Sequence, residues 1–70
     1  MSDLRTQTLE HIRRINDDTG EGARCPHAEM IAEAEAAIRD GQSEWRKDRW
    51  GVPGRWITPA GREALAKASA

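Results

Sequence analysis

The chain has 70 residues, of which 33% are charged, and a formal net charge of −1. At this length we expect one domain that buries roughly 60% of its unfolded-chain surface, which leaves no room for a deep catalytic cleft. One cysteine excludes an internal disulfide bond, and no apolar run suits a signal peptide or a membrane span, so we predict a cytoplasmic protein without membrane contact.

Aromatic and charged residues are unevenly distributed along the chain. Phe and Tyr are absent, and the three tryptophans are Trp45, Trp50 and Trp56. Residues 1–40 hold five Lys/Arg and nine Asp/Glu, whereas residues 41–62 hold five Lys/Arg and two Asp/Glu. The tryptophans therefore lie in the basic part of the chain.

A repeat of apolar residues predicts the first element. Leu9, Ile12 and Ile15 share one face at helical spacing, so we expect a helix over residues 4–16. The turn formers and carboxylates that follow predict an exposed acidic loop over residues 17–25.

The second predicted helix covers residues 26–40. Pro26 suits the first turn of a helix, where its missing N–H costs nothing, and Gly41 suits the C-terminal cap. The polar side of this helix carries an acidic stripe of Glu29, Glu33 and Asp40. Such a stripe is either a solvated face or a second contact surface for a partner.

Residues 43–58 lack a helical repeat and predict a β-hairpin. Within it, Pro53 and Gly54 suit the two central positions of a type II turn. A last helix is predicted over residues 59–68, because Thr58 can cap its first amides and Pro59 suits its first position.

The end of the chain resembles a known family. Arg39-Asp40-Gly41, a charged hairpin and the run Arg55-Trp56-Ile57-Thr58-Pro59-Ala60-Gly61-Arg62-Glu63-Ala64-Leu65 are similar to the wing and following helix of bacterial winged-helix regulators of the multidrug-resistance and phenolic-acid repressor type. The resemblance covers residues 36–67 and implies a winged, DNA-binding fold. A complete helix-turn-helix needs two short helices before the wing, whereas here only the helix over residues 26–40 fits.

Together these elements predict one small α+β domain over residues 1–70. Its order is helix, helix, β-hairpin, helix, similar to a truncated winged helix. We expect the helices to cover one face of the hairpin. The predicted core consists of Leu4, Ile12, Ile15, Met30, Ile31, Ile38, Ile57 and Leu65.

The hairpin carries the main candidate site, because tryptophan and arginine are enriched at interface hot spots. The predicted partner-binding residues are Trp45, Arg46, Lys47, Arg49, Trp50 and Arg55. In one alternative, two tryptophans fill the core and the arginines are merely solvated. In another, Trp45 and Trp56 lie in the core while Trp50 and the arginines near the tip are exposed.

Metal binding and catalysis find little support in the sequence. Cys25, His27 and His11 lack the paired spacing of zinc ligands. Cys25 and His27 do not point toward each other as a nucleophile and its base must. We therefore expect no metal, no cofactor and no enzymatic activity.

These features predict a binding protein whose partner is a protein or a protein–nucleic acid complex. In size and style the chain is similar to phage or mobile-element inhibitors of host machinery, of which anti-CRISPR proteins are one type. The alternative is a DNA-binding transcriptional regulator that contacts phosphates through the hairpin and forms a homodimer through its first helix. The acidic stripe argues against inserting the second helix into a DNA groove, because the phosphates are negative.

Overall fold

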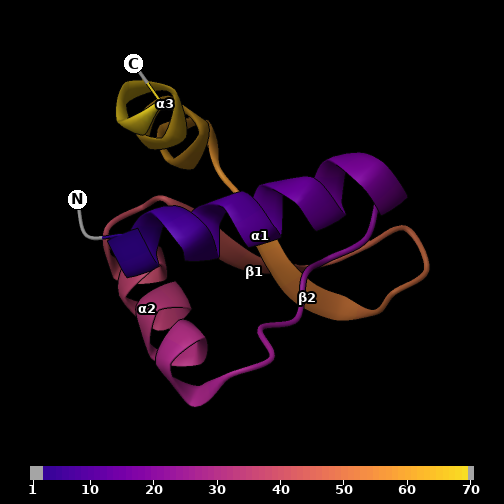
Figure 1. Ribbon diagram of the computed structural model, residues 1–70. Helices are drawn as coiled ribbons and strands as arrows, with labels where there is room; N and C mark the ends of the chain where they lie inside the picture. Colours follow the sequence, from indigo (N-terminus) through magenta and orange to yellow (C-terminus); the bar gives the residue numbers. More distant parts are fainter. Residues whose placement is uncertain (1–2, 70) are drawn as a thin grey trace.

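The computed structural model describes residues 3–69, so residues 1, 2 and 70 of the predicted domain lie outside the described part. The chain forms helix α1 (Asp3–Thr19), helix α2 (Ala28–Arg39), strands β1 (Ser43–Lys47) and β2 (Pro53–Ile57), and helix α3 (Pro59–Ala68) (Figure 1). This order confirms the predicted α+β arrangement.

Helix α1 runs past its predicted end at residue 16 and stops at Thr19. The turn formers stay helical because they bond within the helix. Asp17 accepts a hydrogen bond from Arg13 Nη1 at 3.2 Å, and Thr19 Oγ1 donates to the carbonyl four residues earlier at 2.7 Å. Gly20, with a φ of 70°, then ends the helix.

Helix α2 begins at Ala28 rather than at the predicted Pro26. His27 is its N-cap and has extended backbone (φ −123°, ψ 150°), so Pro26 lies outside the helix. The predicted stop at Gly41 is confirmed. Gly41 has a φ of 75°, and the N–H groups of Gly41 and Gln42 donate to the last-turn carbonyls at 3.1 and 2.8 Å, the pattern of a Schellman motif.

Strands β1 and β2 pair antiparallel in a register that sets Trp45 opposite Arg55. Ala23 forms a bridge on the other edge of β2, where it exchanges two backbone hydrogen bonds with Arg55 at 2.8 and 3.1 Å. Among the described residues, β2 therefore has neighbours on both edges, whereas β1 has one only on its β2 side.

The hairpin turn lies earlier in the chain than predicted. Asp48 O accepts from Gly51 N at 3.0 Å, and Asp48 N donates to Val52 O at 3.0 Å. The loop is therefore Arg49-Trp50-Gly51, with Gly51 in the left-handed region at φ 79°. Pro53 and Gly54 belong to β2, so the predicted type II turn was wrong.

Gly54 has a packing role rather than a turn role. A Cβ on Gly54 would lie 2.7 Å from the Cα of Gly22, and one on Gly22 would lie 2.6 Å from the Cα of Gly54. The two backbones touch here, which only a pair of glycines permits.

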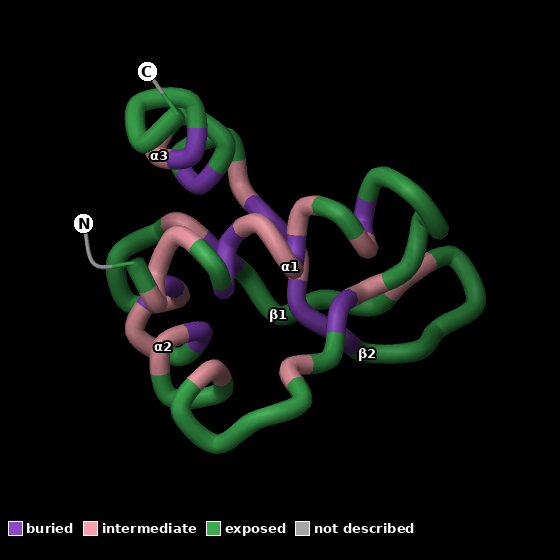
Figure 2. Tube along the Cα trace, in the orientation of Figure 1, coloured by how far each residue is buried: buried purple, intermediate pink, exposed green. Residues whose placement is uncertain are grey.

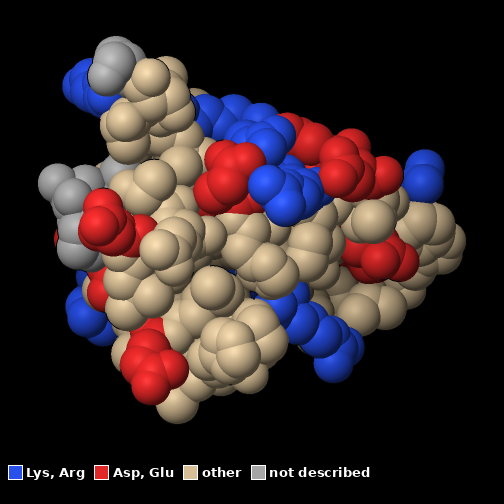
Figure 3. Space-filling view, viewed as in Figure 1, with Lys and Arg blue, Asp and Glu red and all other residues tan. Residues whose placement is uncertain are grey.

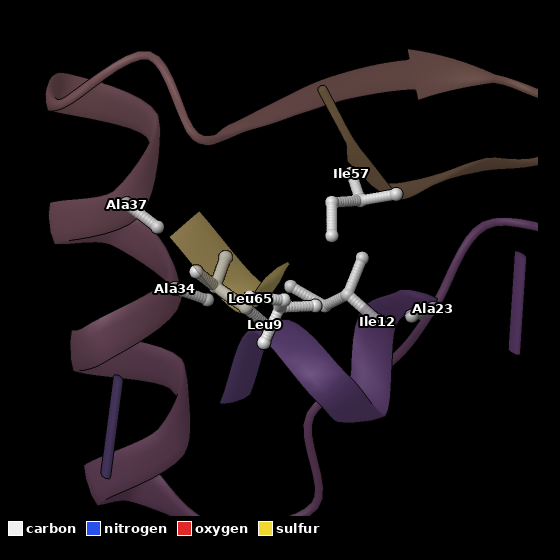
Figure 4. Close-up of a cluster of buried hydrophobic side chains, with 7 residues drawn as sticks. All are labelled: Leu9, Ile12, Ala23, Ala34, Ala37, Ile57 and Leu65. Atoms are coloured by element: carbon white, nitrogen blue, oxygen red, sulfur yellow. The ribbon is translucent and has the colours of Figure 1, made fainter. Parts of the chain in front are cut away.

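The core lies between the three helices and β2 and contains small residues on α2. The buried hydrophobic residues are Leu9, Ile12, Ala23, Ala34, Ala37, Ile57 and Leu65 (Figure 4). Figure 2 shows buried positions on the inward sides of the helices and along β2, whereas the hairpin end far from α2 is mostly exposed. The alanines of α2 let its backbone approach α1 closely.

The predicted core is partly correct. Ile12, Ile57 and Leu65 are buried as predicted. The half-buried members of the predicted set are Leu4, Ile15, Met30 and Ile38. Ile31 is 42% exposed, because α2 turns its alanines toward the core and Ile31 toward the hairpin.

Helix α3 begins at the predicted cap. Thr58 Oγ1 accepts from Gly61 N at 3.1 Å and donates to Gly41 O at 2.6 Å, so one hydroxyl ties the start of α3 to the end of α2. Gly61 is buried against the carbonyl of Gln42, where a Cβ would collide.

Candidate functional site

The hairpin loop presents Arg49 and Trp50 at the tip. The Asp48 carboxylate fixes the loop by accepting hydrogen bonds from Trp50 N at 2.8 Å and Val52 N at 3.0 Å. Trp50 is 58% exposed, and Arg49 Cζ lies 4.3 Å from the centroid of its ring. The tip is therefore an exposed aromatic ring with a guanidinium stacked on it.

Trp45 is a surface residue as well. It is 57% exposed, and all of β1 after Ser43 is exposed, because β1 is the outer strand. The alternative that places Trp45 in the core is therefore wrong for this residue. The alternative with two tryptophans in the core is wrong as well, because Trp45 and Trp50 are both more than half exposed. Trp56, on β2, is half-buried, which agrees with its predicted inward position only in part.

Arg55 is not a free surface residue, which corrects its predicted place in the exposed site. The residue is 6% exposed, and its Nη2 donates to Glu35 Oε1 on α2 at 2.7 Å. Its Cζ lies 5.1 Å from the Trp45 ring centroid. Arg55 thus lies between Trp45, its partner across the strand pair, and Glu35 on α2.

The opposite face of the hairpin is cationic. Arg46 Cζ lies 4.2 Å from the ring centroid of Trp56, and Arg46 Nε lies 3.4 Å from Glu44 Oε1. Within residues 3–69, neither Lys47 nor Arg49 forms an ion pair. A hollow of about 260 Å³ on this face is lined by Gly20, Arg46, Lys47, Asp48, Arg49 and Trp56.

The predicted acidic surface is only partly available to a partner. Arg5 on α1 donates from Nε to Glu33 at 2.6 Å and from Nη1 to Asp40 at 2.9 Å. These carboxylates hold α1 against α2, which corrects their predicted role as a free second surface. Glu29 is exposed.

Acidic and basic side chains alternate over α1. Arg62 on α3 donates to both carboxylate oxygens of Asp17 at 2.8 and 3.1 Å, and this contact holds the pKa of Asp17 below its ordinary value. Arg13 bonds to Asp17 and also to Glu10. Figure 3 shows the result as blue and red side chains interleaved over α1. This face therefore carries no extended patch of only acidic or only basic side chains.

One residue that positions the site, Asn16, was not predicted from the sequence. Asn16 is 7% exposed, and its Nδ2 donates to Glu21 O at 2.9 Å and to Arg55 O at 3.2 Å. Its Oδ1 accepts from Ile57 N at 2.8 Å. Asn16 thereby fixes β2 to α1, although in sequence it looks like one more turn former before Asp17.

The histidines and the cysteine do not form a common site. His11 Nε2 lies 2.7 Å from Arg24 O, which joins α1 to the segment before α2. Among residues 3–69, no three side chains of His, Cys, Asp or Glu are grouped as metal ligands.

Comparison with family models, with curated proteins and with solved structures finds nothing that matches this chain. Within residues 3–69, none of the helices combines the length and the apolar character needed to cross a bilayer.

Proposed function

We propose that this chain is a non-enzymatic binding protein that engages a macromolecular partner through its Trp/Arg hairpin. One observation carries the proposal. Trp45 and Trp50, on one short hairpin, are both more than half exposed. Large aromatic residues exposed on a small domain are typical of contact surfaces, and tryptophan and arginine supply most hot-spot residues.

The hairpin is built to hold these rings in place. Asp48 fixes the loop, and arginines stack on the rings of Trp45, Trp50 and Trp56. A preorganised surface loses less entropy on binding than a mobile one. The more specific proposal, a phage or mobile-element inhibitor such as an anti-CRISPR protein, rests on the small size of the domain and on the separation of acidic and basic residues along the chain.

The test is affinity capture followed by quantitative mass spectrometry. The bait is compared with a Trp45→Ala/Trp50→Ala variant and with a Glu63→Ala/Lys67→Ala variant on α3, whose two side chains are exposed and pair with each other at 3.2 Å. We expect a protein that is enriched by the bait and by the α3 variant and is lost with the hairpin variant. A partner retained by the hairpin variant contradicts the proposal.

The second candidate is DNA binding through the hairpin, and the cationic hollow of Arg46, Lys47 and Arg49 favours it. The resemblance of residues 36–67 to the wing and following helix of winged-helix regulators is the sequence-based reason to consider it. Against this candidate, α2 carries Glu29 and Glu35 on its exposed surface.

Fluorescence anisotropy with generic duplex DNA tests this candidate. If three cations each neutralise one phosphate, affinity should fall about 40-fold between about 50 and 200 mM salt. An Arg46→Ala/Arg49→Ala variant should bind more weakly and with a shallower salt dependence. Absence of binding at low salt removes this candidate and leaves the first one standing.

A further inference from the structure

A groove of about 310 Å³ lies beside Trp45, on the face of the hairpin opposite the cationic hollow. Its lining residues are Ala23, Arg24, Cys25, Ile31, Trp45, Pro53 and Arg55. The lining includes no carboxylate, and its two charged groups are both guanidinium groups. The groove therefore combines an apolar wall with two guanidinium groups, of which Arg55 is paired with Glu35 and Arg24 has no ion pair among residues 3–69.

Arg55 at the groove is incompletely bonded. Its Nη2 donates to Glu35, but its Nη1 is buried and has no hydrogen-bond acceptor among residues 3–69. The whole side chain is only 8% exposed. A buried charged donor without a partner is unfavourable, and native proteins rarely contain one.

The other walls define which chemistry the groove can accept. Ile31 and Trp45, which are 42% and 57% exposed, form the apolar wall, and Arg24 is an exposed cation without an ion pair among the described residues. Cys25 is half-buried, and burial raises the pKa of its thiol, so it stays uncharged. An occupant thus needs one negative charge and an apolar group beside it.

We propose that this groove binds a carboxylate flanked by an aliphatic side chain, supplied by an acidic and apolar segment of the protein partner. The carboxylate accepts from Arg55 Nη1 and faces Arg24, and the aliphatic group lies between Ile31 and Trp45. This inference rests on the proposed function and adds the chemistry of the partner to it. Nucleic acid is disfavoured here, because the groove has an apolar wall and the hollow lined by the cations Arg46, Lys47 and Arg49 is a separate one.

Access to Nη1 requires a movement of Trp45. The atom exposes less than 1 Å², and the ring stacks on the guanidinium group at 5.1 Å. More than half of Trp45 is solvent-exposed, and its rotation breaks the weak stacking contact with Arg55. Binding should therefore perturb the Trp45 indole and the Arg55 side chain together.

Nuclear magnetic resonance of the labelled protein tests the proposal with 4-methylpentanoate, which joins a carboxylate to a leucine-like side chain. The matched probe is the uncharged 4-methylpentanamide. We expect the carboxylate to shift Arg55 Nε–H, the Trp45 indole N–H and the Ile31 methyl groups, and to bind about tenfold more tightly than the amide. Equal binding of both probes overturns the assignment, as does the absence of these shifts up to about 50 mM probe, well above millimolar fragment affinity.

Variants at exposed positions test binding without disturbing the buried core, so a loss of binding does not reflect a loss of folding. Arg24→Gln and Ile31→Ala, at exposed positions, should each weaken carboxylate binding several-fold, whereas Arg39→Gln at the exposed end of α2 should not. Shifts centred on Arg46, Lys47 and Arg49 instead would assign the anion to the cationic hollow and overturn the proposal.

The two proposals fail in different ways. If the probe does not bind the groove but the Trp45→Ala/Trp50→Ala variant still loses the captured protein, only the groove assignment is wrong. If the probe binds but capture is unaffected by the hairpin variant, the hairpin function is wrong.

Discussion

Asn16 on α1 accepts a hydrogen bond from the backbone N–H of Ile57, 41 residues further along the chain, at 2.8 Å. The same side chain donates to the carbonyl of Arg55. A single amide therefore serves two adjacent peptide groups of β2 in the interior, and it joins the first helix to the strand beneath the candidate site.

Replacement of Asn16 by alanine should destabilise the fold by about 2–3 kcal/mol, because it leaves the buried N–H of Ile57 and part of the bonding of Arg55 O unsatisfied. Urea unfolding followed by circular dichroism measures this change. The control is Asp18→Ala, an exposed position on the same helix, which should change stability by less than about 0.5 kcal/mol. Equal effects of the two variants would show that Asn16 is not a structural link.

Replacement of Gly61 by alanine should destabilise the fold even though alanine is the better helix former. The new Cβ would lie 2.1 Å from the carbonyl oxygen of Gln42, and overpacking against backbone of this kind costs up to about 3 kcal/mol, more than the gain of about 1 kcal/mol in helix propensity. The opposite change on the same helix, Ala66→Gly at an exposed position, should cost only about 1 kcal/mol. A stabilised Gly61→Ala variant in thermal unfolding would contradict the close approach of α3 to Gln42.

Substitutions of Gly51 test where the hairpin turn lies. A Cβ at this position has nothing within 4 Å, so Gly51→Ala measures only the left-handed backbone at φ 79° and should cost about 1–2 kcal/mol. Gly51→Asn should cost less, because asparagine tolerates this conformation better. If the type II turn at Pro53 and Gly54 were formed instead, the two Gly51 variants would be equally stable in thermal unfolding.

Acid should weaken the contact between α1 and α3. The bond from Arg62 lowers the pKa of Asp17 in the folded state, so the unfolded chain takes up this proton more readily as the pH falls. The contribution of Asp17 is complete at neutral pH and is lost as the pH falls below about 5 toward its lowered folded pKa.

Urea unfolding between neutral pH and pH 3 follows this loss. Arg62→Gln should reduce the slope of stability against pH in the acid range, whereas Arg24→Gln, without an ion pair among residues 3–69, should leave it unchanged. Because Asp17 and Arg62 are both more than one-third exposed, high salt should diminish the difference. An identical slope in the wild type and Arg62→Gln would remove Asp17 as its source.

The order of helices and strands was predictable because it depends on local signals. The repeat of Leu9 and Ile12, the stop at Gly41, and Thr58 before Pro59 each act within a few residues. Local signals misled at Pro53 and Gly54. Their order suits a turn, but contact with Gly22, far away in sequence, places Gly54 in a strand.

The residue types of the candidate site were predicted from the sequence, but the burial of each residue was not. Tryptophan and arginine at alternating positions indicated a contact surface, yet the burial of Arg55 depends on the Ala23 bridge and on Glu35, which the hairpin sequence does not contain. The exposed place of Trp45 likewise follows from β1 being the outer strand. The pairing of Arg5 with Glu33 and Asp40 depends on how α1 crosses α2, and side-chain charge alone does not specify that.

The Ala23 bridge also has a consequence for solubility. Because it occupies one edge of β2, the outer edge of β1 is the side of the sheet on which another chain could add a strand. Glu44, Arg46 and Lys47 line that strand, and charged side chains at a sheet edge oppose aggregation. The charges on the outer strand thus protect the protein in concentrated solution, and an apolar replacement there would expose a short aggregation-prone edge.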